Sequence, residues 1–406
     1  MADGLADVWY RVTDLEVASG RGCVVTTTDG VDYLDFSSGI AVTSTGHCHP
    51  HVVEAIQAQA SKFIHAQVNV YRHTRLVELA ERLAAITPAS VDTFFFANSG
   101  AEDTESAVKL AKQATGRPHV IVFQGSFHGR THLAMALTTS KTVYRAGHAP
   151  LPAGVFVAPF PKDDDEVESC LDAVRLLLAT QTAPAETAAM LIEPVLGEGG
   201  YIPAPSAFLP GLAAIGREHG ILLIADEVQS GFGRTGTMFN VEQHGLEPDV
   251  LVMAKGLASG FPISAIGASA ELMARWPTGS HGGTYGGNPI GCAAAIATID
   301  VLTAPGFLDD VQARGEQLRA GLRSLAADED GGVVDVRGPG LMVAAELAEP
   351  ARVAAVISHC LSEGRLILMN AGTFGSVIRW MPPLVVSEAE IDAALASFAK
   401  ALIATR

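Results

Sequence analysis

The sequence predicts an α/β protein with a large domain, built on a mostly parallel central sheet that helices cover, and a smaller α+β domain. Three observations support this prediction. Short apolar runs recur between residues 93 and 255, helical patterns lie between several of them, and from about Val301 the pattern becomes helix, short strands and helix. Unbroken apolar runs are typical of strands that are buried on both faces of a parallel sheet.

The composition indicates a globular chain that is large enough for two domains, with 406 residues, 48% of them hydrophobic and 17% charged. Lys and Arg number 27 against 44 Asp and Glu, and the net charge of −17 disfavours binding to nucleic acid or anionic membranes. The N-terminal MADGLADVWYR has no apolar core segment and is not expected to be a secretion signal. Five scattered cysteines without a CxxC pair indicate reduced thiols, so we expect a cytoplasmic protein.

The first elements that the sequence predicts are a β-hairpin and two helices. Asp29 and Gly30 stand between two strand-like runs within residues 24–36, which is a good hairpin signal. Pro50 is predicted to open a helix, because proline is favoured at the first helical position. The apolar positions of this helix are Val53, Ile56 and Ala60. A second apolar helix face stops at Pro88 and comprises Leu76, Leu79, Ala80 and Leu83.

The strands of the central sheet are predicted at residues 93–98, 119–124, 154–159, 189–194, 221–226 and 249–255. Helices are predicted at residues 101–115 and 207–220, and Gly220 is placed to end the second. The acidic run at 163–168 indicates the solvated start of another helix. We expect three segments: 1–45, which joins the small domain, 46–300, which forms the large domain, and 301–406, which forms the small domain.

Distinctive residues follow the ends of these strands, where ligands of open α/β sheets bind. They are Asn98 to Gly100, Gly125 to Arg130, Glu193 to Gly200, Asp226 to Gln229, and Lys255. The sequence therefore predicts one pocket at the carboxyl edge of the sheet.

Asp226 raises a specific question, because it ends the buried run in ILLIADEVQSGFGRTG at 221–236. A buried carboxylate is costly without a partner. Two cations are candidates: Lys255, and the protonated ring nitrogen of a bound cofactor.

Lys255 ends another apolar run, and a lysine near a buried strand end is uncommon. Desolvation favours its amine form, which can form an imine with a carbonyl; a lysine that reaches the surface is the alternative. In ANSGAE at 97–102 a strand turns into a helix, which makes either an anion site or an ordinary turn. Pyridoxal phosphate would satisfy all three positions, with its phosphate at this turn, its aldehyde at Lys255 and its pyridinium at Asp226.

The neighbouring residues fit the same cofactor. Phe127 and Val228 would pack on the two faces of its ring, and Gln229 would bind the ring hydroxyl. Arg130 and Arg379 would suit a substrate with two carboxylates, because arginine binds carboxylates in a bidentate manner.

The segment HCHPH at 47–51 is predicted to form a turn and a helix start rather than a metal site. Pro50 interrupts a chelating geometry, and no second ligand group of matching type is evident. No metal is expected.

The chain resembles the class III aminotransferases, pyridoxal-phosphate enzymes of fold type I, over nearly its whole length. The motifs that carry the resemblance are NSGAE at 98–102, FHGRT at 127–131, EPVLGEGG at 193–200, ADEVQSGFGRTG at 225–236, AKGLASGFP at 254–262 and GGTYGGNP at 282–289. The resemblance implies that Lys255 binds the cofactor covalently and moves the proton, and that Asp226 pairs with the pyridine nitrogen.

The resemblance also implies that Gly100 and Ala101 hold the phosphate and that His128 belongs to the cofactor site. Thr284 would reach the phosphate of a neighbouring subunit, in a homodimer or a dimer of dimers. Asp103 and Thr104 depart from the family pattern, where small apolar residues are common, and are expected to face solvent.

Within the family, the chain most resembles the 4-aminobutyrate aminotransferases. This implies transfer of an amino group from 4-aminobutyrate to 2-oxoglutarate by a ping-pong mechanism, giving succinate semialdehyde and glutamate. Ile40 would line the substrate pocket and Arg130 would hold the distal carboxylate. Glu198 would pair with Arg379 in the first half-reaction and release it in the second to bind the α-carboxylate.

Three alternatives remain. Acetylornithine aminotransferases, and other class III enzymes that use ω-amino acids or diamines, share almost every motif. A fold-type-I aminomutase, racemase or decarboxylase would share Lys255 and Asp226. A cofactor-binding regulatory module without catalysis would not need the full set of catalytic positions.

Overall fold

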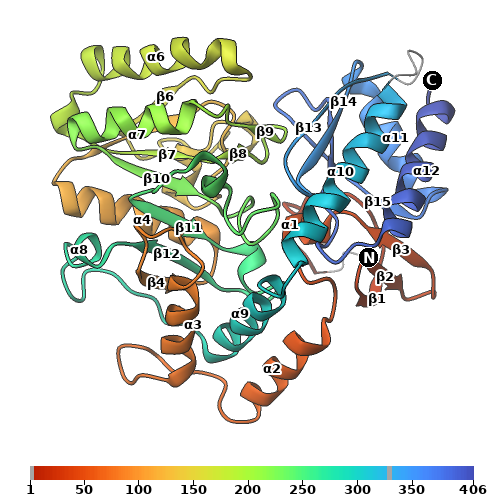
Figure 1. The fold of residues 1–406 in the computed structure, drawn as a ribbon, viewed down its shortest axis with the longest axis horizontal. Coiled ribbons are helices and arrows are strands. Elements are labelled where there is room, and N and C mark those ends of the chain that lie inside the picture. The colour runs from red at the N-terminus through yellow and green to blue at the C-terminus, as the bar shows by residue number, and fades with distance from the viewer. Residues whose placement is uncertain (1–3, 327–331) are drawn as a thin grey trace.

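The chain folds into a larger part around a seven-stranded sheet and a smaller part around two four-stranded sheets (Figure 1). This arrangement comes from a computed structural model, which describes residues 4–326 and 332–406. In spatial order, the large sheet contains β4 (Thr93–Ala97), β12 (Ser264–Ala268), β11 (Val250–Met253), β10 (Leu222–Asp226), β7 (Thr187–Ile192), β5 (His119–Phe123) and β6 (Val155–Ala158). The predicted α/β fold with a mostly parallel central sheet is therefore confirmed.

All six predicted runs form strands of this sheet. β5 pairs in parallel with β6 and β7, and β10 pairs in parallel with β7 and β11. The sequence does not predict β12, which pairs antiparallel with both β4 and β11. This strand consists mainly of small residues, which give no apolar run. Their size is required by the packing, because a Cβ atom on Gly267 would lie 2.4 Å from Cγ1 of Val91.

Helices cover both faces of the sheet (Figure 1). α4 (Gly100–Thr115) packs through Ala107 and Val108 on one face, and α6 (Val167–Thr180) and α7 (Phe208–His219) pack on the other. The strands serve both faces because successive side chains alternate between them. Gly220 ends α7 in the left-handed region with φ +61°, as predicted. The acidic run forms η2 (Asp164–Glu166), a 3₁₀ turn that leads into α6.

Two predicted helix faces are wrong in part. Asp103 and Thr104 do not face solvent but are fully buried, because they lie on the side of α4 that packs against the sheet. α2 (Pro50–Ala60) begins at Pro50 as predicted, but Ala60 is exposed. The buried residues of α2 are Val52 and Gln59, so its inner face is rotated by about one residue from the prediction. The other helices of this part are α3 (Thr74–Ala84), α5 (His132–Leu137), α8 (Ala270–Met273) and α9 (Pro289–Leu302).

The smaller part combines both ends of the chain. One sheet has the order β1 (Val17–Arg21), β2 (Val24–Thr27), β3 (Asp32–Asp35) and β15 (Leu366–Ile367). The other has the order β13 (Val333–Arg337), β14 (Val343–Leu347), β17 (Val377–Trp380) and β16 (Met369–Ala371). The helices are α10 (Phe307–Ala326), α11 (Pro350–Ser362) and α12 (Glu388–Ala404).

The predicted hairpin is confirmed, since β2 and β3 pair antiparallel on either side of Asp29 and Gly30. β3 also pairs in parallel with β15, so the N-terminal hairpin lies beside the C-terminal segment. The proposed domain boundaries after residues 45 and 300 remain a prediction. Two short elements lie close to the site described below: α1 (Ser38–Ala41) and the ribbon β8 (Val195–Leu196) with β9 (Ile202–Pro203).

The histidine-rich segment at 47–51 makes local contacts. Nε2 of His47 lies 2.8 Å from Oδ2 of Asp35, and His49 immediately precedes α2. Across residues 4–326 and 332–406, no group of three His, Cys, Asp or Glu side chains is placed to hold a metal ion.

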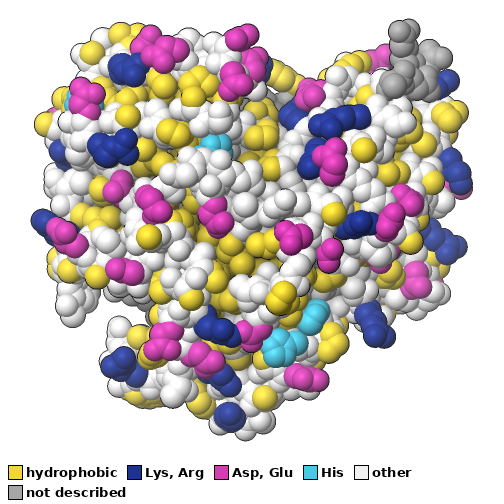
Figure 2. All heavy atoms as spheres, in the orientation of Figure 1, with side chains coloured by type: hydrophobic (Ala, Val, Ile, Leu, Met, Phe, Trp, Pro, Cys, Tyr) yellow, Lys and Arg dark blue, Asp and Glu magenta, His cyan; other side chains and the backbone are white. Residues whose placement is uncertain are grey.

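The surface in Figure 2 has acidic and basic side chains interspersed over both parts. No single helix within the described residues is long and apolar enough to span a membrane. The bent pair of α9 and α10 reaches the required length and apolar composition only when the two helices are taken together.

Candidate active site

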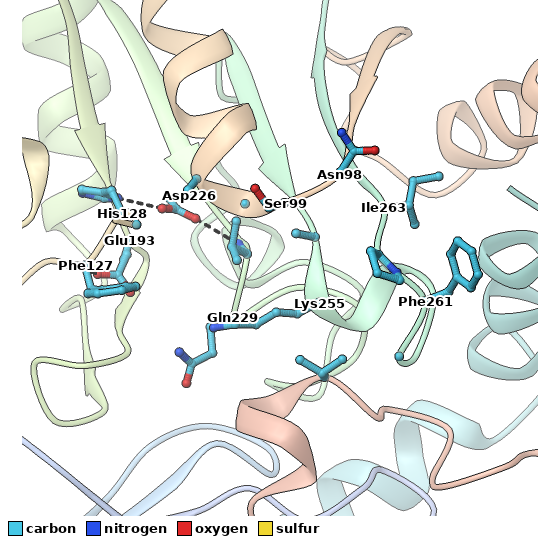
Figure 3. Close-up of a pocket in the computed structure, with 18 residues that line it drawn as sticks. Asn98, Ser99, Phe127, His128, Glu193, Asp226, Gln229, Lys255, Phe261 and Ile263 are labelled. Carbon is cyan, nitrogen blue, oxygen red and sulfur yellow. Dashed lines mark hydrogen bonds and ion pairs between the residues drawn. The ribbon is translucent and has the colours of Figure 1, made fainter. Parts of the chain in front are cut away.

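A cavity of about 390 Å³ lies at the carboxyl edge of the large sheet, where the sequence predicts the pocket (Figure 3). Most of the residues that line it come from the ends of β4, β5, β7, β10 and β11 and the segments after them, and Val42 follows α1. They include Asn98, Ser99, Gly100, Ala101, Phe127, His128, Glu193, Asp226, Val228, Gln229 and Lys255. Residues that are far apart in the sequence thus form one site.

Asp226 is the last residue of β10 and is only 4% exposed. Its Oδ2 lies 2.7 Å from Nδ1 of His128, and its Oδ1 accepts a hydrogen bond of 3.0 Å from the backbone N–H of Val228 (Figure 3). Asp226 is therefore held by His128, and not by Lys255, which was one of the two predicted cations. The two fixed contacts leave the carboxylate oriented beside the cavity.

Lys255 follows β11 and begins the short 3₁₀ helix η5 (Lys255–Leu257). Its φ of +42° is rare for a residue with a side chain, and such strain is common at functional sites. Desolvation lowers the pKa of Lys255, although the negative charges of Glu198 and Glu193 oppose this shift. A lower pKa leaves more of the lysine as the nucleophilic amine at neutral pH. Figure 3 shows its side chain extended across the pocket.

The N-terminus of α4 forms another wall of the cavity. The Ser99 hydroxyl caps the helix by accepting a hydrogen bond of 3.3 Å from the N–H of Glu102. Within the described residues, the N–H groups of Gly100 and Ala101 have no acceptor. Gly100 also allows close packing, because a Cβ atom there would lie 2.8 Å from Cγ1 of Val228. Free N–H groups at a helix N-terminus favour an anion.

A second group of charged residues lies beside Lys255. Arg379 on β17 is 2% exposed, and its Nη1 donates to Oε1 of Glu198 at 2.5 Å. Oε2 of Glu198 accepts a hydrogen bond of 2.9 Å from the hydroxyl of Tyr144. Burial alone would raise the pKa of Glu198, but the charge and hydrogen bond of Arg379 outweigh it and lower the pKa. Glu198 is therefore a carboxylate in this arrangement.

Arg130 joins this group through Tyr144. Its guanidinium carbon lies 4.7 Å from the centre of the Tyr144 ring, within the range of a cation–π contact. The structure thus brings together Arg130, Glu198 and Arg379, the three charged residues that the sequence singled out for substrate binding.

Arg130, Glu198 and Arg379 lie outside the lining of the cavity. Ile40 and Thr284 do not line it either. Ile40 is 39% exposed and has a φ of +68°, while Val42, two residues on, lines the cavity. Thr284 lies in an exposed loop before α9. Their predicted roles, one toward substrate and one toward a neighbouring subunit, remain predictions.

Sequence reasoning gave no role to Glu193 or Tyr144. Glu193 accepts hydrogen bonds from the N–H groups of Phe127 at 2.7 Å and Gly197 at 2.9 Å. Burial raises its pKa to about 7, with His128 opposing and Asp226 supporting the shift. The sequence contained a signal for Glu193, because this acidic residue directly follows a run of apolar residues that forms a buried strand. Asp226 stands at the end of a similar run. Tyr144 lies in the short 3₁₀ helix η1 (Thr142–Tyr144) and gave no such signal.

A sequence model of the family described as Aminotransferase class-III matches residues 5–402. The chain belongs to the class III aminotransferases. As a member of this family, it is a transaminase that depends on pyridoxal phosphate.

Curated relatives of this aminotransferase differ in their named substrates. It is 41% identical to the 5-aminovalerate aminotransferase of Pseudomonas putida over 95% of this chain and 93% of the relative. It is 39% identical to the 4-aminobutyrate aminotransferase of Escherichia coli, over 91% and 89%. It is 41% identical to the acetylornithine aminotransferase of Methanothermobacter thermautotrophicus, over 95% and 93%.

The fold of the aminotransferase matches that of solved relatives. The ornithine aminotransferase from Toxoplasma gondii superposes with a TM-score of 0.89 at 28% identity, over 99% of this chain and 93% of that one.

The cavity fits pyridoxal phosphate by its own geometry. The unpartnered N–H groups of Gly100 and Ala101 suit a phosphate, and Lys255 offers an amine with a lowered pKa. Asp226, oriented by His128, offers a carboxylate for a protonated ring nitrogen.

Proposed function

We propose that this aminotransferase moves the amino group of an ω-amino acid, first of all 4-aminobutyrate, to 2-oxoglutarate. The observation that carries the proposal is the ion pair of Arg379 and Glu198 beside Lys255, with Arg130 close by. An ω-amino acid has no carboxylate on the carbon that bears the amine, so Arg379 must be neutralised by another group. 2-Oxoglutarate has two carboxylates and can engage both arginines.

The names of the relatives support this substrate class. The P. putida relative is named for 5-aminovalerate and the E. coli relative for 4-aminobutyrate. Both compounds carry the amine at the end of the chain that is far from the carboxylate. The archaeal relative named for acetylornithine makes N-acetylornithine the main alternative donor.

Bound pyridoxal phosphate supplies an electron sink for the carbon that carries the reacting nitrogen. Gly100 and Ala101 would hold its phosphate through their N–H groups. Asp226, which His128 orients, would keep a negative charge beside the ring nitrogen. Phe127 and Val228 would flank the ring, and Gln229, which accepts a hydrogen bond from Tyr201 at 2.8 Å, would bind the ring hydroxyl.

Lys255 would hold the cofactor covalently and, once released, move the proton with its Nζ. Its lowered pKa suits both tasks, because a general base acts best when its pKa lies near the working pH. Arg130 would bind the distal carboxylate of either substrate, while Ile40 would contact the substrate chain from the α1 side.

The same pocket would serve two unlike substrates because Glu198 and Arg379 can part. With an ω-amino acid bound, their pairing avoids an unsatisfied buried guanidinium. With 2-oxoglutarate bound, Arg379 would turn to the α-carboxylate.

We also propose a cytoplasmic homodimer, alone or paired into a dimer of dimers, with Thr284 reaching the phosphate site of the partner. The loop that holds Thr284 is supported by a ring contact of 5.3 Å between His65 and Tyr285. Large apolar side chains are exposed around it, at Ile64, Val70 and Tyr285. Light scattering would give the assembly, and Thr284→Ala should weaken cofactor retention; a fully active monomer would contradict the proposal.

The function is tested by a screen of donors and acceptors. 4-Aminobutyrate, 5-aminovalerate, β-alanine and N-acetylornithine would each be paired with 2-oxoglutarate and with pyruvate, and kcat/KM would be compared. We expect the highest values for 4-aminobutyrate with 2-oxoglutarate. A marked preference for N-acetylornithine would reassign the donor. Formation of product without conversion of the cofactor to its amine form would indicate a different reaction type.

A further inference from the structure

Tyr144 contacts three residues that have separate proposed tasks. Its hydroxyl donates to Oε2 of Glu198 at 2.9 Å, and its ring lies under the guanidinium of Arg130 at 4.7 Å. The same ring meets that of Phe127 edge to face, with 5.0 Å between centroids and an interplanar angle of 73°. No other residue in the described part of the chain makes all three contacts.

We propose that Tyr144 is a positioning residue, which stabilises Glu198 when Arg379 leaves it and holds Arg130 in place for the distal carboxylate. This inference rests on the proposed function, because it concerns the exchange between two substrates. Tyr144 does not line the cavity that contains Lys255 and Asp226, and it acts through Glu198 and Arg130.

The hydroxyl matters most in the second half-reaction. While Glu198 pairs with Arg379, its two oxygens each have a donor. Once Arg379 turns to the α-carboxylate of 2-oxoglutarate, Tyr144 is the one side-chain donor that remains to Glu198 among the described residues. A carboxylate that is mostly buried, with 13% side-chain exposure, is costly without a donor. The Tyr144 hydroxyl therefore lowers the cost of releasing Arg379.

The protonation state of Tyr144 suits this task. Burial, and then the neighbouring charge of Glu198, raise the pKa of Tyr144 to about 12. The hydroxyl consequently keeps its proton throughout the neutral range and remains a donor.

The ring has a second, separable effect. A guanidinium over an aromatic face is stabilised and oriented by the cation–π interaction. Arg130 is otherwise exposed, so the ring of Tyr144 restricts the orientation of its guanidinium group. This effect would serve both half-reactions equally, because each substrate presents a distal carboxylate.

Two substitutions separate the two effects. Tyr144→Phe removes the hydroxyl and keeps the ring, whereas Tyr144→Leu removes both. Each half-reaction of the holoenzyme would be followed by single-turnover absorbance of the cofactor, with 4-aminobutyrate alone and then with 2-oxoglutarate on the amine form. Tyr33→Phe, a tyrosine of the N-terminal hairpin, is the matched control, and thermal unfolding would verify that each variant is folded.

For Tyr144→Phe we expect kcat/KM to fall about 10-fold or more with 2-oxoglutarate and less than about threefold with 4-aminobutyrate, as for a lost hydrogen bond to a charged group. For Tyr144→Leu we expect both half-reactions to fall about 10-fold or more. Tyr33→Phe should match the wild type.

The outcomes distinguish this inference from the proposed function. A wild-type protein that does not react with 4-aminobutyrate overturns the proposed function, whatever the variants do. A wild type that reacts with both substrates, together with equal losses or none in the two half-reactions of Tyr144→Phe, overturns the inference alone.

Discussion

Asp226 and Glu198 are both acids of the same site, but their hydrogen-bond donors differ in kind. Asp226 is held by a backbone N–H and by a histidine that is itself buried. Glu198 is held by two long side chains, those of Arg379 and Tyr144. The backbone donor of Asp226 cannot leave without unfolding of the local chain, whereas both donors of Glu198 are side chains, which can rotate away. The cofactor end of the site is therefore fixed, and the substrate end is able to change partners.

Under the proposed function, this difference would explain how one pocket serves two substrates. The chemistry at Lys255 and Asp226 is the same for each amine, so that end benefits from rigidity. The substrates differ in whether a carboxylate lies next to the reacting carbon, and that difference falls on the exchangeable pair.

The largest effect is expected at the fixed end, for Lys255→Ala. Loss of the lysine removes both the covalent attachment and the proton carrier, so turnover should fall by at least about 10⁴-fold. Steady-state kinetics would measure the loss, and the absorbance of the purified protein should no longer show covalently attached cofactor. Full activity in this variant would refute the assignment of the whole site.

A smaller but still large effect is expected for Asp226→Asn. The amide keeps the shape and the contact with His128 but lacks the charge, so kcat should fall about 10²- to 10³-fold with saturating cofactor. Asp249→Asn is the matched control, because Asp249 accepts a hydrogen bond of 2.7 Å from the N–H of Leu223 at the opposite end of β10. Equal losses in the two variants would mean that Asp226 acts through stability alone.

At the exchangeable end, Arg379→Ala should give unequal losses. We expect kcat/KM for 2-oxoglutarate to fall about 100-fold, because a bidentate carboxylate contact is lost, and that for 4-aminobutyrate to fall less than about 10-fold. Single-turnover absorbance would follow each half-reaction. Arg175→Ala, on the exposed side of α6, is the control and should change neither. Equal losses for the two substrates would argue against an alternating pair.

Much of the fixed end could be predicted from the sequence, because each of its parts follows a buried strand. Asp226, Lys255 and the turn at Gly100 all stand directly after apolar runs, and the edge of a parallel sheet brings such positions together. The contact of His128 with Asp226 could not be predicted in the same way. It depends on the path of the loop after β5, which no local pattern specifies.

The exchangeable end was less predictable, since its residues come from both parts of the molecule. Arg379 lies on β17 of the smaller part, and Glu198 lies after β7 of the larger one. Their pairing depends on how the two parts pack, so the sequence suggested it only through a family resemblance. Tyr144 was missed because a tyrosine in a polar, irregular segment has no signal of its own.

A third kind of acid provides the smallest and last test. Asp103 is fully buried under the turn at Gly100, and neither of its oxygens has a hydrogen-bond partner among the described residues. The nearby hydroxyls of Ser264 and Ser106 donate instead to the carbonyl oxygens of Ser99 and Glu102. Burial raises the pKa of Asp103 well above its usual value, and these hydroxyls offset only part of the rise.

The sign of the resulting pH dependence follows from proton binding. Above the ordinary pKa of 3.8 the unfolded chain releases the Asp103 proton while the folded chain retains it, so this residue makes stability fall as pH rises through that window. Asp103→Asn removes the titration and keeps the shape. The variant should therefore be more stable than the wild type by about 1–2 kcal/mol at pH 8, and by less at pH 5. Urea unfolding at both pH values would measure the difference, with the exposed Asp164→Asn as a control that should change stability by less than about 0.5 kcal/mol. A variant that is less stable than the wild type at pH 8 would show that Asp103 is ionised and has a partner, which would place it with Asp226 among the fixed acids.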